Sequence, residues 1–346
     1  ALMTLAYPRP YRLIKESQGG VRTNTRLSFH EADWVYRQLG EDEKMDLVET
    51  VRPHGYYQEM REPMMQWMNQ YLAKNTRDWH EPELEIFPDS MLQVTPTGQV
   101  NSSYQSKKVI DFCYEHAQER LPHRDPLYTP EENKARRDEL AELIMNRTGI
   151  TLPEEAPKLI ARKKYTVSKD FQLEQAVIES EQEIYLPLLV GKSPSSNSNG
   201  PTIILVDDRG KSALTNKEGL FRRLVGAGHS VVAVDLRGYG ETKSTNLSGR
   251  DRKGGWVKQL LGVENLRYAY GALHTNNSIM GMRIFDLLQT LNALPLLELD
   301  TSAIVIGRGG CGIQALHAAV LSDQIRGVCL WRSISNYMDV IRGPLY

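Results

Sequence analysis

Between residues 201 and 346 the sequence alternates short apolar runs with amphipathic stretches, and this alternation restricts the possible folds more than any other feature. The pattern is typical of βαβ units, in which parallel strands lie buried between layers of helices. Strands are expected at residues 201–206, 230–235, 303–306 and 327–331. Helices are expected at residues 217–227, 280–294 and 313–321, with a Gly-, Asn- and Lys-rich insertion at residues 242–276. The back of the chain therefore predicts a mostly parallel sheet covered by helices.

The front of the chain repeats the pattern on a smaller scale. Strands are expected at residues 11–14 and 45–49, and helices at residues 26–39 and 59–72. An apolar stripe at helical spacing marks the second helix, formed by Met60, Met64, Trp67, Met68 and Tyr71. Such a stripe indicates a face that packs on a core rather than a cofactor site. Three antiparallel strands, at residues 163–167, 173–179 and 184–190, then lead into the back of the chain.

A charged stretch that contains several prolines lies between the front and the back of the chain. The prolines are Pro82, Pro88, Pro96, Pro122, Pro126, Pro130 and Pro153. One polar helix is expected at residues 131–147, and the rest predicts a connector that wraps a surface. The sequence therefore predicts three parts. They are residues 1–75, a connector over residues 76–158, and residues 159–346.

The charge of the chain is nearly balanced, with 42 Lys and Arg residues against 43 Asp and Glu residues in 346. A net charge of -1 creates no global field that attracts a polyanion, so we expect no nucleic-acid partner. No apolar run approaches the ~18–20 residues that a membrane span needs, so none is expected. The three cysteines, Cys113, Cys311 and Cys329, lack C-x-x-C spacing and predict neither a disulfide frame nor a metal site.

Three motifs resemble parts of the α/β-hydrolase superfamily. They are Val-Ala-Val-Asp-Leu-Arg-Gly-Tyr-Gly-Glu-Thr at residues 232–242, the strand that runs into Gly307-x-Gly309-x-x-Gly312, and Pro-His-Gly-Tyr at residues 53–56. The similarity is to acetyl-xylan-esterase and prolyl-oligopeptidase-like members, over about residues 1–75 and 160–346. It implies an α/β-hydrolase-like three-layer sandwich with a mostly parallel sheet, joined here to the proline-punctuated helical connector. It also implies a small-molecule or carbohydrate ester substrate and no cofactor.

The order of the blocks departs from that family, in which the catalytic His follows the nucleophile turn. Residues 1–75 resemble the C-terminal portion of a hydrolase domain, with its last strands, His turn and closing helix. Residues 159–346 resemble the N-terminal portion, which includes the nucleophile turn. Two explanations stay open. The chain is either a fragment of two tandem hydrolase domains or a circularly permuted single domain, and we expect the two portions to pair in one sheet.

The resemblance places the nucleophile on the strand-to-helix turn at residues 307–312, which we call the elbow. A serine hydrolase needs a side chain on this sharp turn, and the following backbone N–H helps to hold the oxyanion. The register puts Gly309 at the nucleophile position and Gly310 after it, so the attacking side chain is absent. Cys311 is the nearest alternative nucleophile, but it comes two residues late, and a buried structural cysteine is the simpler interpretation.

His54 lies in the turn where family members hold the general base. The acid that orients such a base is expected at residues 15–21, where Glu16 is the single carboxylate and comes early in the loop. A turn histidine that hydrogen-bonds its neighbours is the alternative interpretation.

The stretch at residues 201–211 resembles the strand and oxyanion loop of the family. It ends in Asp208, Arg209, Gly210 and Lys211, where a His-Gly-containing turn is usual. These residues predict either an oxyanion loop or a solvated charged turn, and the solvated turn is preferred. Asp235, at the end of the next strand, is expected to be a capping or turn carboxylate.

The elbow glycines also fit the dinucleotide fingerprint G-x-G-x-x-G, in which backbone N–H groups bind a phosphate. A single motif of this kind is weak evidence. The acidic residue expected at the end of the next strand is missing, because that strand ends in Leu330-Trp331-Arg332. The hydrolase interpretation is therefore preferred.

Function has to be argued from the site, because this fold hosts many activities. The first hypothesis is a relative of carbohydrate and acyl esterases that is degenerate or incomplete, since the nucleophile position is Gly309. The second is a non-catalytic hydrolase-like binding or scaffolding module. The third is a thiol hydrolase that uses Cys311.

Overall fold

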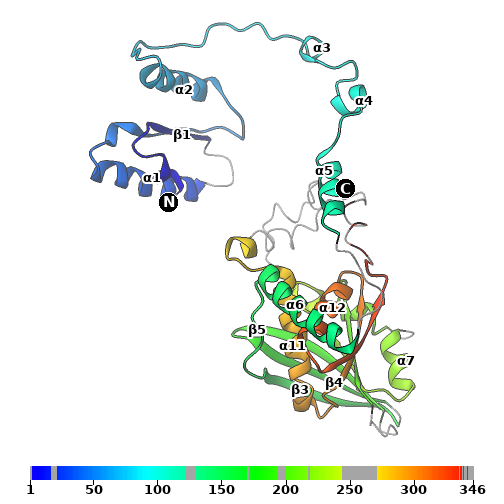
Figure 1. The fold of residues 1–346 in the computed structure, drawn as a ribbon. Helices are drawn as coiled ribbons and strands as arrows, with labels where there is room; N and C mark the ends of the chain where they lie inside the picture. The colour runs from blue at the N-terminus through cyan, green and yellow to red at the C-terminus, as the bar shows by residue number, and fades with distance from the viewer. Residues whose placement is uncertain are drawn as a thin grey trace. The chain divides into compact units, whose positions relative to one another are not determined.

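The computed structural model describes residues 2–16, 22–121, 129–169, 171–193, 200–216, 219–243, 271–334, 336, 338 and 341. The chain forms two compact units, Ala1–Tyr104 and Gln105–Tyr346 (Figure 1). No helix in the described residues is long and apolar enough to cross a membrane. The three-part division expected from the sequence stays a prediction, and most of the expected insertion lies outside the described residues.

The second unit is built on a seven-stranded sheet in the order β3-β4-β5-β7-β6-β8-β9. Its strands are β3 (Lys158–Ser168), β4 (Phe171–Glu181), β5 (Ile184–Lys192), β6 (Thr202–Asp207), β7 (Val231–Val234), β8 (Ala303–Arg308) and β9 (Ile325–Trp331). Antiparallel pairings join β3, β4, β5 and β7, whereas β7, β6, β8 and β9 run parallel. The predicted α/β sheet with a mostly parallel core is confirmed. Residues 203–206 of β6 and all of β7 are continuous apolar runs, as expected for buried strands with both faces covered.

Helices cover both faces of this sheet and give three layers. They are α6 (Pro130–Thr148), α7 (Leu220–Gly226), α11 (Ile279–Asn292) and α12 (Cys311–Leu321), with single turns at η3 (Lys211–Ala213), η4 (Gly240–Thr242) and η5 (Pro295–Leu297). Ile203 and Leu205 of β6 pack with Phe221 of α7 on one face. Ile204 of the same strand packs with Leu287 of α11 on the other face. Alternate side chains of one strand therefore build two separate cores.

The polar helix α6 packs against α11 and α12 (Figure 1), although the sequence placed it in a surface connector. The guanidinium of Arg137 donates to the carbonyls of Val320 (3.0 Å) and Ala319 (3.1 Å), near the C-terminal end of α12. Carbonyls in the last turn of a helix have no partner within the helix, so a cation there stabilises the helix. A helix that is polar on most sides thus joins the helical layer through Arg137 and through Ile144 and Met145, which pack against the core.

The first unit has a sheet of its own, formed by the parallel strands β1 (Tyr11–Glu16) and β2 (Met45–Thr50). Its helices are α1 (Arg22–Gln38) and α2 (Gln58–Tyr71), with single turns at η1 (Leu2–Ala6) and η2 (Asp42–Lys44). The described residues thus form two sheets, one in each unit, and the pairing of the two portions in one sheet stays a prediction. The sequence motifs specify each strand but not which edge it pairs with.

Three more short helices follow, at α3 (Asp89–Leu92), α4 (Val100–Tyr104) and α5 (Val109–Glu119). The sequence predicted no helix here, because prolines and charges interrupt the hydrophobic periodicity. Large apolar side chains in this stretch are exposed, and Ile86 (90%) and Val94 (93%) are nearly fully so.

A buried ion pair fastens the loop after β7 to α11. Asp286 is fully buried and accepts hydrogen bonds from the backbone N–H of Arg237 (2.8 Å) and from its guanidinium (2.5 and 2.9 Å). The Ser180 hydroxyl donates a further bond to the same carboxylate (3.1 Å). Burial by itself lowers the pKa of Arg237, but the hydrogen bonds and charge of Asp286 raise it above its ordinary value. Arg237 therefore stays charged within the fold.

We predict that Asp286→Ala lowers the free energy of unfolding by up to about 3–5 kcal/mol, because the largely buried guanidinium of Arg237 would lose this carboxylate and keep its bond to Glu181 (2.9 Å). The exposed pair Arg136–Glu139 is the control, and Glu139→Ala should cost less than about 1 kcal/mol. Urea denaturation of the three proteins measures both values. Equal costs for the two substitutions would contradict this account of the core.

Candidate functional site

The elbow has the strand–turn–helix form that the sequence predicts. β8 ends at Arg308, Gly309 takes the left-handed backbone conformation (φ +60°), and α12 begins at Cys311. The N–H of Gly309 donates to the carbonyl of Trp331 at the end of β9 (3.1 Å). A side chain is strained at such a φ, so the turn favours glycine at this position.

Asp208, in the loop after β6, covers the elbow. Its Oδ2 accepts the backbone N–H of Gly310 at 2.7 Å. A Cβ atom on Gly309 would lie 2.1 Å from the same oxygen and 2.7 Å from Asp208 Cγ. The carboxylate thus occupies the space of a nucleophile side chain and binds the N–H that would hold an oxyanion. From the sequence a solvated turn was preferred for Asp208, because the residue that it binds is 102 positions away along the chain.

The other residues of the predicted oxyanion loop contact neighbouring parts of the fold. Arg209 pairs with Asp207 (3.2 Å), and its side chain is about half exposed. Gly210 (φ +93°) lies so close to Gly240 that a Cβ atom would come within 2.5 Å of its Cα. Lys211 is largely buried, so a solvated turn is wrong for this residue.

Asp235 is the turn carboxylate that the sequence predicts. It accepts the backbone N–H groups of Lys211 (2.5 Å) and Glu241 (2.9 Å) and pairs with Lys211 Nζ (2.8 Å). The ammonium of Lys211 also contacts Glu241. These contacts join the loops after β6 and β7. The ammonium of Lys211 is therefore bound to carboxylates of the fold.

Tyr239 and Arg283 lie near the elbow, and sequence reasoning missed both. The guanidinium of Arg283 donates to the Tyr239 hydroxyl (2.8 Å) and lies 3.9 Å from the centre of its ring. A Cβ atom on Gly310 would lie 3.8 Å from that hydroxyl. Burial raises the pKa of Tyr239 to about 12, so the phenol stays protonated at neutral pH. No motif marks this pair, since the residues are 44 positions apart.

Cys311 is fully buried in the core beneath the elbow. Burial, and then the nearby Asp208 carboxylate, raise the pKa of its thiol far above the ordinary value. The reactive form of cysteine is the thiolate, which is disfavoured in such surroundings. This environment matches that of a structural cysteine.

His54 is joined to the carboxylate that the sequence considered for it. Nδ1 of His54 lies 2.8 Å from Oε1 of Glu16, the last residue of β1. The imidazole is otherwise open to solvent, with 92% of the side chain exposed. The hydrogen bond from His54 lowers the pKa of Glu16. A carboxylate on Nδ1 is how a general base is oriented in a triad, but this pair belongs to the first unit and the elbow to the second.

The environment of the elbow does not favour a nucleotide phosphate. The N–H of Gly310, at the start of α12, is already bound to the Asp208 carboxylate, whose charge would repel a phosphate. Gly307 and Gly312 instead permit close packing, since Cβ atoms there would meet Cys311 O (2.7 Å) and Ser333 Oγ (2.3 Å). Within the described part of the chain, no group of three or more metal-binding side chains converges.

No protein-family model and no curated protein matches this chain. Among solved structures, a protein described as an acetyl xylan esterase from Bacteroides fragilis NCTC 9343 is 17% identical, with a TM-score of 0.47 over 65% of this chain and 61% of that one. Acetyl xylan esterase 1 from Thermoanaerobacterium sp. JW/SL YS485 is 18% identical (TM-score 0.38, 56% of each chain). A glucuronoyl esterase from Solibacter usitatus is 12% identical (TM-score 0.41, 61% of this chain and 64% of that one). This chain therefore spans less than two thirds of each of these esterases.

We predict that Gly309→Ala destabilises the protein by more than the ~1–2 kcal/mol that a left-handed backbone costs an L-residue, because its Cβ also collides with Asp208. In an Asp208→Ala background the collision is removed, so the same substitution should cost only that backbone component. Urea unfolding of the two single variants and the double variant measures the coupling. A cost that is unchanged by Asp208→Ala would contradict the proximity of the two residues.

We predict that His54→Ala raises the pKa of Glu16 towards its ordinary value, because the hydrogen bond that lowers it is lost. Since folding lowers this pKa, the pair stabilises the fold above the unfolded pKa of Glu16, and the contribution is lost as the pH falls through the folded pKa. Carbon-detected NMR titration of the Glu16 carboxyl measures the shift. Glu59, whose pKa is lowered by Arg52, serves as the control and should not change.

Proposed function

We propose that this chain is an α/β-hydrolase-like relative of carbohydrate esterases in which the elbow does not perform serine-type ester hydrolysis. The observation that supports it is the Asp208 carboxylate on the N–H of Gly310, directly over Gly309. The sequence motifs and the three-layer sheet support the relationship to the superfamily. Acetylated or otherwise esterified carbohydrates, as in the names of the similar structures, are the ligand class to test.

The chemistry of acyl transfer supports the loss of activity. The reaction needs an attacking side chain and free N–H donors aimed at the developing oxyanion. Gly309 offers no side chain, and the N–H of Gly310 already faces a carboxylate, whose negative charge would destabilise an oxyanion there. Cys311, buried and held as the thiol, does not replace the missing serine.

A non-catalytic binding module is the second candidate function. The loops at the carboxyl ends of β6 and β7 are tied by Asp235 and Lys211, so this edge of the sheet is ordered without a reacting group. Such an edge is where open α/β sheets bind ligands. Binding of acetylated xylo-oligosaccharides without turnover, measured by calorimetry, would favour this candidate over an inactive fold with no ligand.

Two tandem hydrolase-like portions are the account of the chain order that we propose. We infer that the first unit corresponds to the C-terminal portion of one domain and the second unit to the N-terminal portion of another. The parallel sheet of the first unit and its His54–Glu16 pair support this assignment. The alternatives, a circular permutant and a specific kinship with prolyl-oligopeptidase-like members, have no further support.

We predict that the purified chain hydrolyses neither p-nitrophenyl acetate nor acetylated xylan above the uncatalysed rate. His54→Ala and Cys311→Ala should show the same background, because neither residue serves a working elbow. Release of p-nitrophenol and of acetate measures the rates. Turnover by the wild type that falls by tenfold or more in either variant would contradict the proposal.

A further inference from the structure

A polar pocket of about 370 Å³ lies on the antiparallel part of the seven-stranded sheet. Residues of β3, β4 and β5 line it, together with Glu298, which directly follows η5. Its volume is within the range of ~300–1,000 Å³ that small-molecule sites occupy, and most of its lining side chains are polar or charged. In the order of the sheet, β7 and β6 lie between this pocket and the elbow strand β8.

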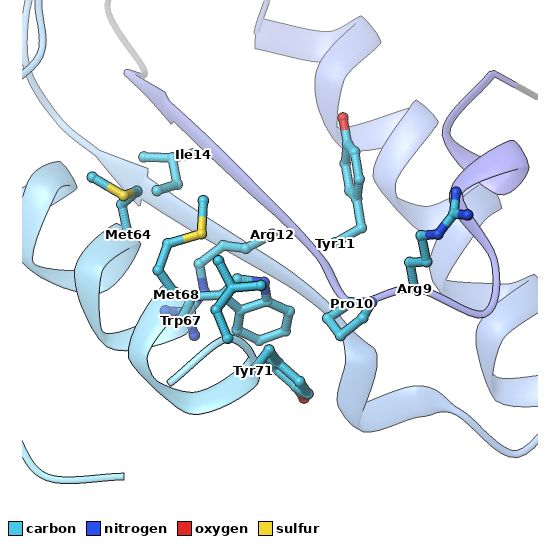
Figure 2. A pocket seen from close by; sticks show the side chains of 10 residues that line it. Arg9, Pro10, Tyr11, Arg12, Ile14, Met64, Trp67, Met68 and Tyr71 are labelled. Carbon is cyan, nitrogen blue, oxygen red and sulfur yellow. The ribbon is translucent and has the colours of Figure 1, made fainter. Parts of the chain in front are cut away.

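The first unit has a groove of a different kind. That groove lies beside β1 and is lined mainly by apolar side chains, among them Met64, Trp67 and Met68 of α2 (Figure 2). Met68, from the stripe expected to pack on a core, is 44% exposed. If the first unit is the C-terminal portion of a domain, the rest of that domain would cover this groove. Charged side chains are depleted where protein surfaces pack together, so the polar pocket of the second unit suits a small solute instead.

The pairing of the strands places the polar side chains of the pocket in two neighbouring rows. In one row, Lys164 of β3 pairs with Glu174 of β4. In the next row, Thr166 of β3 pairs with Gln172 of β4, which pairs with Lys192 of β5. Directly paired residues and residues two positions apart share one face of a sheet. The five side chains therefore meet on one face.

Both carboxylates of the pocket already have cationic partners. Glu174 is buried and accepts two hydrogen bonds from the guanidinium of Arg162 (2.6 and 3.2 Å). Glu298 accepts another bond from Arg162 (3.1 Å) and one from Lys164 Nζ (3.5 Å). Three cations, Arg162, Lys164 and Lys192, thus face two carboxylates. The cluster has one positive charge in excess.

The ammonium of Lys192 is where an anion would bind. It donates to the backbone carbonyls of Leu297 (2.7 Å) and Glu298 (3.3 Å), and it has no ion pair in the part of the chain that the structure describes. An ammonium has three N–H donors, so one stays available. Burial lowers the pKa of Lys192, although the charges of Glu174 and Glu298 raise it. Its positive charge is therefore incompletely compensated, and a bound anion would compensate it.

We propose that this pocket binds a small hydroxylated carboxylate, such as a sugar acid, with its carboxylate on Lys192. The Thr166 hydroxyl and the Gln172 amide, whose side chains have no hydrogen-bond partner among the described residues, would bind the hydroxyl groups. One excess positive charge matches one carboxylate, whereas a phosphate ester carries about 1.5–2 negative charges at pH 7. The pocket shares no residue with the elbow, so the inference goes beyond the proposed function and does not depend on it.

Isothermal titration calorimetry of the full chain with D-glucuronate tests the proposal. Saturable binding is expected, and D-glucose, which lacks the carboxylate, should bind at least about tenfold more weakly. Lys192→Met removes the ammonium and should weaken glucuronate binding at least about tenfold. Lys163→Met is the matched control, because Lys163 lies on the opposite face of β3 from Lys164 and should not affect binding. No saturable binding of glucuronate, or equal binding by the wild type and Lys192→Met, would overturn the proposal.

A second variant separates loss of the site from loss of the fold. Gln172 is exposed, so Gln172→Leu should fold normally and yet weaken glucuronate binding several-fold, because a donor to the hydroxyl groups is lost. Unchanged binding by this variant would contradict the part that hydroxyl groups play in recognition. Tighter binding of inorganic phosphate than of glucuronate would contradict the assignment to a carboxylate.

NMR titration of the lysine side chains locates the ligand. Saturating glucuronate should raise the pKa of Lys192 towards its ordinary value, because a bound carboxylate favours the charged ammonium. D-glucose should leave this pKa unchanged, and Lys163 should not respond to either compound. If glucuronate binds but the pKa of Lys192 does not change, the ligand lies elsewhere and the proposal is wrong.

Discussion

Carboxylates bound to backbone amides hold the carboxyl edge of the seven-stranded sheet. Asp235 accepts the N–H groups of Lys211 and Glu241 and so joins the loops after β6 and β7. Asp208 reaches from the first of these loops to the N–H of Gly310 and joins it to the elbow. Each of these carboxylates therefore gives a hydrogen-bond partner to backbone N–H groups that the sheet leaves unpaired.

The bond between Asp208 and the N–H of Gly310 bears directly on function. An esterase keeps the N–H donors of its elbow free for the charge that develops in the transition state. Here the donor of Gly310 stabilises the resting fold, and the neighbouring Gly309 carries no group that reacts. In a hydrolase the corresponding N–H would be free to bind the oxyanion. Here the Asp208 carboxylate binds it and has a structural role. The backbone form of the elbow also places Cys311 and α12 against the core of the sheet.

Hydrophobic periodicity predicted the strands and most helices, because it reports on local burial. It does not specify which strand edges pair, because pairing joins strands that lie far apart along the chain. Asp208 and Lys211 were assigned to a solvated turn because their partners lie far along the chain. The role of α6 was missed for the same reason, since Arg137 binds carbonyls of α12 more than 180 positions away. Glu16, in contrast, was found from its position relative to His54.

Amide exchange at Gly310 tests the central claim most directly. If the Asp208 carboxylate holds this N–H, NMR-detected hydrogen exchange at Gly310 should be slow in the wild type. It should be at least about tenfold faster in Asp208→Ala, which corresponds to the loss of a hydrogen bond worth about 1–3 kcal/mol. Asp208→Asn keeps an acceptor oxygen and should retain most of the protection. Fast exchange in the wild type, or equal rates in the wild type and Asp208→Ala, would show that the elbow is open and would contradict the account.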